Sequence, residues 1–448
     1  MLKEKNKNIN NMNGKRFIGR LEYFGSLLFD LERKEYIPFD KDATSILFNI
    51  SNFRDIDEIY YRYFSNKFNY LSYKSFIQLS QYLGIINDDY SLNVDFLVNE
   101  EIELLNEYKI LSAPLKVYFA LTYRCPLRCK HCFSNSGDVE DSLKKDELSF
   151  EKIKNILKEL KGLGVYYVSF GGGEPFDKDN FIQLLEYCND LNLVVFISTS
   201  LISFDRYYQE IIDNNIKIKE FKVSIDAVSS RDYSNIKGRS YFDKLKNNLK
   251  LLKKYKELNN EVVIRFHFVL NKLNYNDLPA FLNFAEQYEA DKLSFSPIFI
   301  TGRATKDLAL SNEILKKIDT VINNMKERTR IEIEFFNVPL EVGKTGLYTG
   351  FGCGCGKTVC YISPYGDVLP SGMFINYKEK FSYGNIKNTS FKQIWLNTYL
   401  KEINNISEYD NRCRECEYFD NCRGGCRFRS FNEFNSLIYK DPTCYIKK

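Results

Sequence analysis

Apolar strand-like runs alternate with amphipathic helical stretches, and this alternation limits how the chain can fold more than any other feature. It begins at Leu115 and gives six strand–helix repeats before residue 310. Parallel strands need a long crossover between them, and a helix usually supplies it. The pattern predicts an α/β fold whose parallel sheet curls into a partial barrel. The expected strands are Val117–Leu121, Val165–Phe170, Leu193–Ser198, Phe221–Ile225, Val262–Leu270 and Lys292–Ile300.

Three cysteines, Cys125, Cys129 and Cys132, follow the first expected strand with the spacing C-x3-C-x2-C. They can ligate three irons of a [4Fe–4S] cluster and leave the fourth iron without a protein ligand, so that it can bind a substrate or cosubstrate directly. The next cysteine, Cys188, is far along the chain and is expected to be an ordinary buried residue. The alternative is a zinc site, for which His131 is the nearby fourth ligand.

The cysteine spacing resembles that of the radical S-adenosylmethionine (radical SAM) superfamily. In that family the methionine end of SAM chelates the bare iron, and electron transfer splits SAM to give a 5′-deoxyadenosyl radical. The resemblance implies a partial (β/α)6 TIM-type radical SAM barrel, with SAM and a [4Fe–4S] cluster as cofactors. In TIM-type barrels the chemistry lies at the C-terminal ends of the strands, where these cysteines fall.

Other strand ends carry residues that match the family's SAM-binding positions. Gly172, Gly173 and Glu174 match the GGE motif, which holds the amino group of SAM. Glycine there also lets the backbone approach a ligand closely. The resemblance also implies that the ribose hydroxyls and nearby groups of SAM are contacted by three residues at later strand ends. These residues are Ser224, Asp226 and Asn271.

Two further segments differ from the family pattern. Thr199-Ser200-Leu201 stands where relatives often show Thr-Asn-Gly, and no role is assigned to it. Lys237-Gly238-Arg239 resembles a common Arg-Gly pair. Both a contact with the SAM carboxylate and a solvated surface pair remain open for this segment.

The C-terminal cysteines have the spacing C-x2-C-x5-C-x3-C-x17-C, which resembles the end of the SPASM domain of radical SAM enzymes. That resemblance implies two auxiliary iron–sulfur clusters, with Cys426 ligating the inner one. A zinc ribbon is the alternative for such cysteine pairs. The outer cluster would be held by Cys413, Cys416, Cys422 and Cys444.

The inner auxiliary cluster departs from the family pattern. Cys353 and Gly366 fit the upstream segment, but Ser371 stands where a cysteine is expected. Cys355 and Cys360 are candidates to compensate, so all three upstream cysteines are predicted metal ligands. A smaller cluster, or one with an open iron, is equally compatible with this sequence.

The N-terminal part reads as a separate small domain. Two apolar runs, Leu21–Phe29 and Tyr36–Phe39, flank a polar turn and predict a β-hairpin. Three helical stretches follow, and the whole resembles the PqqD-like winged helix-turn-helix of peptide maturases. Such a module would bind a leader peptide as an added strand. DNA binding is disfavoured because the expected recognition helix, Tyr73–Leu83, has no basic excess.

Composition excludes several classes of protein. With 63 Lys+Arg against 59 Asp+Glu, the net charge of +4 calls for neither nucleic acid nor a membrane surface as partner. No apolar run is long enough for a membrane span, and the first residues lack a signal-peptide core, so a cytoplasmic protein is expected. Twelve cysteines in such a protein indicate metal rather than disulfides.

The sequence thus predicts a radical SAM maturase that abstracts hydrogen from a ribosomally made precursor peptide and closes a thioether or carbon–carbon crosslink. A flavodoxin or ferredoxin is the expected electron donor. The alternatives are a sulfatase-type maturase that forms formylglycine and a zinc-binding scaffold protein. The predicted parts are a disordered tail (1–15), a recognition domain (16–99), a linker helix (100–114), the barrel (115–310), a bridge (311–352) and the SPASM domain (353–448).

Overall fold

The structure is a computed structural model of the chain. It describes residues 14–52, 55–97, 100–137, 145–336, 353–403, 406 and 409–446, so most of the predicted N-terminal tail lies outside the described residues. The chain divides into two compact units, the first ending at Ala113 and including Gly162–Gly164, and the second comprising Pro114–Lys161 and the chain from Val165 onward. Within the described ranges, no helix has the length and apolar character needed to cross a membrane.

The first unit contains a four-stranded sheet in the order β3-β2-β1-β4. Neighbouring strands β1, β2 and β3 are antiparallel, whereas β4 pairs in parallel with β1. The strands are β1 (Phe17–Glu22), β2 (Gly25–Asp30), β3 (Glu35–Asp40) and β4 (Val94–Leu97).

The predicted hairpin exists and joins β2 to β3, but one strand prediction is wrong. Leu21–Phe29 is not one strand, because the chain turns at Tyr23 and Phe24 and enters β2 through Gly25 at φ +143°. A side chain at Gly25 would also collide with the backbone of Asp40. Strand β4 was not predicted, since four residues after a polar loop give no clear alternation.

The three predicted helical stretches of this unit are confirmed. They are α1 (Lys41–Asn52), α2 (Ile56–Ile59) continuing into the π-helical turn Tyr60–Phe64, and α3 (Tyr70–Tyr82). Their apolar faces pack with Phe17 and Leu28 of the sheet into one core. The short helix α4 (Ile102–Tyr108) also belongs to this unit. Near the end of the unit, the Ser112 amide donates a hydrogen bond to Glu22 Oε2 at 2.7 Å.

The second unit contains a ten-stranded sheet in the order β11-β10-β9-β8-β7-β6-β5-β12-β13-β14. The six predicted strands are confirmed, and they run parallel and in sequence order. They are β5 (Lys116–Thr122), β6 (Tyr167–Gly172), β7 (Val194–Thr199), β8 (Glu220–Ser224), β9 (Val263–Leu270) and β10 (Lys292–Pro297).

Four more strands extend the sheet at its two ends. β11 (Glu332–Phe335) pairs in parallel with β10, so this part of the predicted bridge is a strand of the barrel sheet. β12 (Val359–Ile362) pairs in parallel with β5 at the other end, and β13 (Asp367–Leu369) and β14 (Gly384–Asn385) continue from it. The cysteine-rich part therefore shares its sheet with the barrel.

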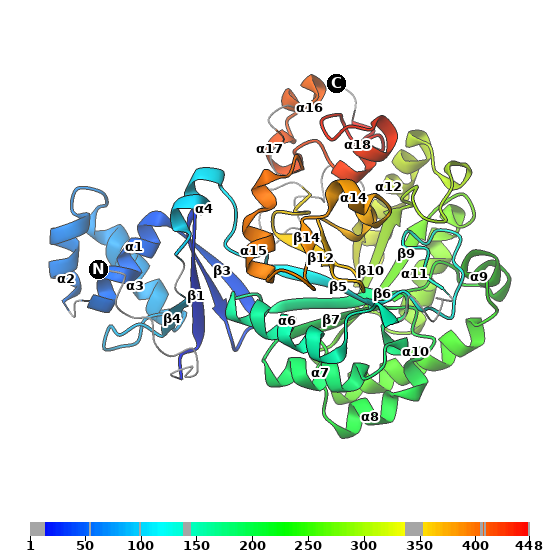
Figure 1. The fold of residues 1–448 in the computed structure, drawn as a ribbon, viewed down its shortest axis with the longest axis horizontal. Helices are drawn as coiled ribbons and strands as arrows, with labels where there is room; N and C mark the ends of the chain where they lie inside the picture. The colour runs from blue at the N-terminus through cyan, green and yellow to red at the C-terminus, as the bar shows by residue number, and fades with distance from the viewer. Residues whose placement is uncertain are drawn as a thin grey trace. The chain divides into compact units, whose positions relative to one another are not determined.

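The two faces of the parallel sheet differ in chemistry. One face consists of buried apolar residues, such as Val117, Phe170 and Phe221, and the helices of the repeats cover it (Figure 1). The α6 side chains that pack there follow helical spacing at Ile153, Ile156, Leu157 and Leu160. The other face is polar, and we call it the polar face of the sheet.

The predicted helices of the repeats are confirmed, and shorter ones follow in the cysteine-rich part. The repeat helices are α6 (Phe150–Gly162), α7 (Phe181–Asp190), α8 (Tyr208–Asp213), α9 (Ser230–Lys237), α10 (Phe242–Leu258), α11 (Leu278–Gln287) and α12 (Asn312–Lys326). The later ones are α14 (Lys378–Phe381), α15 (Phe391–Leu396), α16 (Asn411–Arg414), α17 (Phe419–Cys422) and α18 (Arg427–Phe434).

Candidate active site and metal centres

Cys125, Cys129 and Cys132 lie in the loop that follows β5, which we call the triplet loop (residues 123–137). The Cys125 amide donates to the carbonyl of Gly137 at 3.1 Å. Arg303, after β10, donates its amide hydrogen to Cys132 O at 3.0 Å and its Nε hydrogen to Cys129 O at 2.9 Å. Hydrogen bonds to the backbone of all three cysteines therefore hold this part of the triplet loop in place.

Helix α9 holds the opposite side of the triplet loop. The amides of Arg128 and Lys130 donate to the carbonyls of Lys237 and Ile236, both at 2.9 Å. The helix ends at Gly238 with φ +70°, where a Cβ would lie 2.7 Å from Arg128 O. Only glycine allows the loop and the helix end to approach this closely.

The surroundings of the three thiols fit a bound iron–sulfur cluster. Burial raises the pKa of Cys129 to about 11 and the pKa of Cys125 well above its usual value, so the thiolates need a positive partner. Two buried polar atoms, His131 Nδ1 and the Tyr233 hydroxyl oxygen, have no hydrogen-bond partner among the described residues. Burial raises the pKa of Tyr233, and the nearby charges of Cys129 and Cys125 add to this shift while Lys237 opposes it. A cluster's sulfur atoms would give these polar groups partners.

Asp226, after β8, connects the triplet loop to α9. It is fully buried, and its Oδ2 accepts hydrogen bonds from Lys237 Nζ and pairs with His131 Nε2 at 3.2 Å. Its Oδ1 accepts the Val269 amide hydrogen at 2.6 Å. Burial alone would raise the pKa of Asp226, but Lys237 and His131 hold it well below its usual range. Asp226 is therefore an ionised anchor inside the protein.

Glu174 is also buried, and β7 supplies its partners. Its Oε1 accepts a hydrogen bond from Thr199 Oγ1 at 2.6 Å, and its Oε2 accepts one from the Ser200 amide at 2.9 Å. Burial raises the pKa of Glu174 to about 7, while these hydrogen bonds oppose the shift. Sequence reasoning missed Thr199 and Ser200, although their place at the next strand end was the signal.

The glycines before Glu174 are required by the chain itself. A Cβ on Gly172, at φ +112°, would lie 2.5 Å from Thr122 O, and one on Gly173 would lie 2.1 Å from Arg124 O. The Glu174 amide donates to Arg124 O at 2.8 Å. The close approach that the sequence led us to expect toward a ligand is thus observed toward the triplet loop, which places Glu174 beside it.

Ser224 and Asn271 occupy neighbouring strand ends. Ser224 is half-buried, and the structure gives its hydroxyl no protein partner among the described residues. The Asn271 side chain is buried and shapes its own turn, donating to Val269 O at 3.0 Å and accepting the Leu273 amide at 2.9 Å. Of these two side chains, the Ser224 hydroxyl is therefore the one that is not engaged in a hydrogen bond with the described residues.

Four C-terminal cysteines come together as the spacing suggested. Cys413, Cys416, Cys422 and Cys444 line one cavity of about 620 Å³, next to Phe419. Burial raises the pKa of Cys422 to about 12, and the nearby thiols of Cys444 and Cys413 add to the shift. Four thiols around one hollow can ligate a cluster completely.

A second group of thiols is formed by Cys353, Cys355 and Cys426. Cys353 Sγ lies 3.3 Å from Cys355 Sγ, and it hydrogen-bonds with the Cys426 thiol. This hydrogen bond, burial and the Cys353 charge raise the pKa of Cys426 well above its usual value. These three residues could hold the inner auxiliary cluster.

The structure does not bring Cys360 to this group. Cys360 is fully buried in β12 opposite Val117, on the apolar face of the sheet, and burial alone raises its pKa. Because strand side chains alternate, its predicted role as a ligand would require it to be on the other face. Ser371 precedes the short helical turn Gly372–Tyr377.

Arg429 is a buried cation close to the inner group of thiols. It is buried, and its Nε donates to Asp441 Oδ2 at 3.1 Å, the same oxygen that accepts the Cys426 amide hydrogen at 2.8 Å. Its Nη1 has no hydrogen-bond partner in the part of the chain that the structure describes. Burial lowers the pKa of Arg429, but Asp441, followed by the Cys426 and Cys353 charges, raises it above its usual value. A negatively charged cluster would suit this cation.

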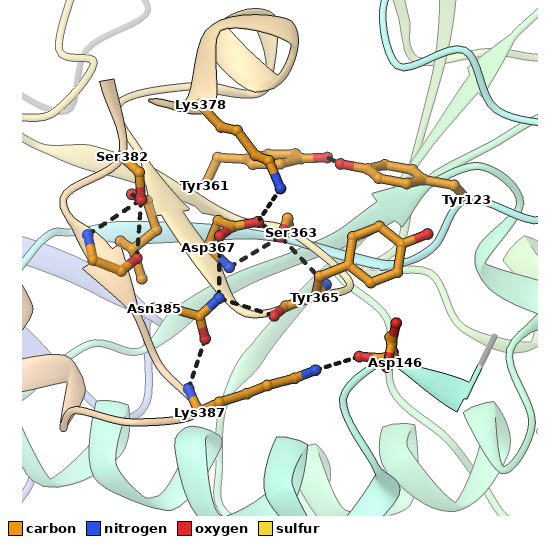
Figure 2. A network of polar contacts seen from close by, with 12 residues as sticks. Tyr123, Asp146, Tyr361, Ser363, Tyr365, Asp367, Lys378, Ser382, Asn385 and Lys387 are labelled. Atoms are coloured by element: carbon orange, nitrogen blue, oxygen red, sulfur yellow. Dashed lines mark hydrogen bonds and ion pairs between the residues drawn. The ribbon is translucent and has the colours of Figure 1, made fainter. Parts of the chain in front are cut away.

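A polar network attaches the β12–β14 part to the triplet loop (Figure 2). Tyr123 and Tyr361 point toward each other, with their hydroxyl oxygens 3.0 Å apart. The Ser363 hydroxyl and Asp367 carboxylate are 3.0 Å apart, and Asn385 donates to Asp367 at 3.1 Å. Since Tyr123 precedes Cys125 by two residues, this network holds the cysteine-rich part against the first cysteine site.

Comparison with known proteins agrees with this arrangement. A model of the radical SAM superfamily matches residues 119–285, and a model of the SPASM iron–sulfur cluster-binding domain matches residues 353–417. Mycofactocin maturase MftC of Mycobacterium tuberculosis (strain CDC 1551 / Oshkosh) is 28% identical over 342 residues, covering 75% of this chain and 83% of the relative. PqqA peptide cyclase of Bradyrhizobium diazoefficiens is 25% identical over 338 residues, covering 74% and 86%.

Solved structures share the fold. SuiB of Streptococcus suis with bound S-adenosylmethionine has a TM-score of 0.71 at 20% identity, covering 96% of this chain and 99% of that one. The enzyme anSMEcpe with bound AdoMet has a TM-score of 0.57 at 18% identity, covering 74% and 94%. The chain thus contains radical SAM and SPASM domains homologous to those of peptide maturases. It is an enzyme whose cofactors are SAM and iron–sulfur clusters, and the zinc-scaffold alternative is not supported.

Proposed function

We propose that this enzyme matures a ribosomally made precursor peptide by closing a thioether or carbon–carbon crosslink. The proposal rests mainly on one observation. A single compact unit contains the three triplet cysteines and two further clusters of cysteine thiols. The name of the homologous PqqA peptide cyclase points to a peptide substrate, as does the SuiB structure bound to its precursor peptide SuiA.

The triplet cysteines would hold the cluster that binds SAM, and reductive cleavage of SAM would supply the hydrogen-abstracting 5′-deoxyadenosyl radical. Glu174 is suited to accept hydrogen bonds from the SAM ammonium group, because Thr199 and Ser200 fix its carboxylate. Ser224 is suited to a ribose hydroxyl. Asp226 would act on SAM indirectly, by holding His131 and Lys237 in place.

Hydrogen loss from Cα or Cβ of the peptide followed by crosslinking is a net oxidation. The surplus electron therefore needs an acceptor. The residues that would hold acceptors are Cys353, Cys355 and Cys426 for the inner cluster and Cys413, Cys416, Cys422 and Cys444 for the outer one. A small electron-transfer protein such as flavodoxin or ferredoxin would supply the reducing electron.

The first unit is our candidate for leader binding. Strand β3 is an end strand of its sheet and carries no further strand on its outer side among the described residues. An extended leader could add there as a fifth strand through backbone hydrogen bonds. The sulfatase-type alternative has no need for such a unit. Removal of residues 1–113 should weaken precursor modification while SAM cleavage persists, and modification at the full rate would refute the leader-binding role.

The test of the function itself is co-expression with a candidate precursor peptide, sought as a short open reading frame beside the gene of this enzyme. A crosslink removes two hydrogen atoms from the peptide, which mass spectrometry detects directly. Fragmentation then locates the joined residues. An aldehyde in place of a crosslink would favour formylglycine formation, and an unchanged peptide mass beside active SAM cleavage would refute crosslinking.

A further inference from the structure

Arg427, in the first turn of α18, is a buried cation that has no acidic partner. The residue is 5% exposed, and no carboxylate pairs with it in the part of the chain that the structure describes. Arg429, two residues further on, is also buried, but its Nε lies 3.1 Å from Asp441 Oδ2. A buried charge is costly unless another charge compensates it. Arg427 therefore lacks the counter-charge that its neighbour has.

Backbone carbonyls take up the hydrogen bonds of the Arg427 guanidinium. Its Nε donates to Gly425 O at 3.2 Å, and its Nη2 donates to Gly424 O. Its Nη1 donates to Leu437 O at 2.5 Å and to Tyr439 O at 3.3 Å. The guanidinium thus joins two segments of the chain, and its donors are satisfied while its charge is not neutralised.

The two acidic side chains that interact with these segments have other partners. Asp441 binds Arg429 through Oδ2, and its Oδ1 accepts the Thr443 amide hydrogen at 2.9 Å. Asp410 holds Arg412, whose Nη2 lies 2.6 Å from Asp410 Oδ2. The counter-charge of the guanidinium must therefore come from another group.

The guanidinium lies directly behind the wall of the cavity that the four outer thiols line. Gly424, whose carbonyl accepts the Nη2 hydrogen, lines this cavity together with Cys422 and Phe419. The Tyr409 ring, whose centre lies 5.6 Å from Arg427 Cζ, packs edge-on against the Phe419 ring at 5.3 Å between centres. A Cβ on Gly424 would lie 2.6 Å from Arg427 Nη2, so glycine keeps this place free for the guanidinium.

We propose that Arg427 supplies the positive charge for the outer auxiliary cluster and thereby favours the reduced form of that cluster. Four thiolates bring negative charge to the cavity, and a one-electron reduction adds one more. A buried cation nearby stabilises the added charge, because the interior screens it poorly.

The inference rests on the proposed function for the source of the electron. The peptide loses one electron when the crosslink closes, and the accompanying proton passes to solvent. The electron would enter the outer site, and an oxidised flavodoxin or ferredoxin would then accept it.

The test is a redox titration of the intact, cluster-loaded enzyme, followed by EPR in the absence of peptide and SAM. The outer cluster is identified by the signal that Cys416→Ser removes. Arg427→Gln keeps a hydrogen-bond donor but removes the charge, whereas Arg427→Lys keeps the charge. We expect Arg427→Gln to shift the equilibrium at least ~10-fold toward the oxidised form, which lowers a one-electron potential by ~59 mV, and Arg427→Lys to stay within ~3-fold of the parent.

Arg423, in the same loop, provides the matched control. Its Cζ lies 4.9 Å from the centre of the Phe419 ring, so this cation is also near the cavity. Its side chain is 37% exposed and its Nη2 lies 3.3 Å from Asp420 Oδ1, so solvent and a carboxylate already compensate the charge. Arg423→Gln should therefore shift the potential less than Arg427→Gln does, and an equal shift would contradict a specific role of Arg427.

Iron content and potential together separate a charge role from a purely structural one. An unchanged potential in Arg427→Gln, or loss of outer-site iron from both Arg427 variants, overturns the proposal. If only Arg427→Gln loses the iron, Arg427→Lys decides: a parental potential supports the proposal, and a lowered one contradicts it. SAM cleavage and peptide mass are measured separately, so a failure of the proposed function is recognised independently.

Discussion

Replacing Asp226 by asparagine tests the connection between the triplet loop and α9. Asparagine keeps the size of the side chain but removes the charge opposite Lys237. Asp226 is fully buried and Lys237 is 1% exposed, so the lysine would keep a buried charge without its partner. Breaking such a buried pair from one side costs ~3–5 kcal/mol.

The sign of the pH dependence is fixed by the direction of the pKa shift. Lys237 and His131 hold the pKa of Asp226 well below the ordinary value of an aspartate, although burial opposes them. The carboxylate therefore stabilises the fold fully above the unfolded pKa, and this contribution is lost as pH falls through the folded pKa. At neutral pH the whole effect of Asp226→Asn should be observed.

Hydrogen exchange in the triplet loop measures the loss. The amides of Arg128 and Lys130 depend on carbonyls at the end of α9. A cost of ~3 kcal/mol corresponds to roughly 10²-fold faster exchange if the loop opens with this helix end. The control is Asp243→Asn, which removes a solvent-exposed ion pair with Lys246 that solvent screens and that should contribute little to stability. Exchange no faster than in this control would refute the reasoning, and Asp226→Leu with Lys237→Met should restore protection.

Other changes test the cysteine sites and Glu174. Alanine at all three triplet cysteines should abolish 5′-deoxyadenosine formation from SAM under anaerobic reduction, and an unchanged yield would end the radical assignment. Cys426→Ser should lower the iron content, whereas Cys360→Ser should retain it; equal losses would make Cys360 a ligand. Because burial raises the pKa of Glu174 to about 7 and only its ionised form attracts an ammonium group, SAM affinity should rise with pH through that value. Glu174→Gln should bind SAM more weakly and without this dependence, as calorimetry at several pH values would detect.

Several features of this protein follow from local sequence alone. The alternation of strands and helices, the C-x3-C-x2-C spacing and the glycines before Glu174 each report on neighbouring residues, where backbone periodicity and sterics decide the outcome. Four of the C-terminal cysteines also meet around one cavity as their spacing indicated. In all these cases the interacting groups are close along the chain or repeat a known spacing.

Contacts between distant segments were decided by the tertiary structure. Thr199 and Ser200 hold Glu174, Asp226 joins His131 to Lys237, and Arg429 lies beside the inner thiols, yet no local pattern marks these partners. Whether Cys360 can be a metal ligand depends on which face of β12 it occupies. A shift of one residue in the register of β12 would place it on the opposite face. The sequence by itself determined which chemical groups stand at the strand ends. Only the packing of β12 against β5 and of α9 against the triplet loop decided which of those groups meet, because pairing across the chain depends on register and burial rather than on spacing.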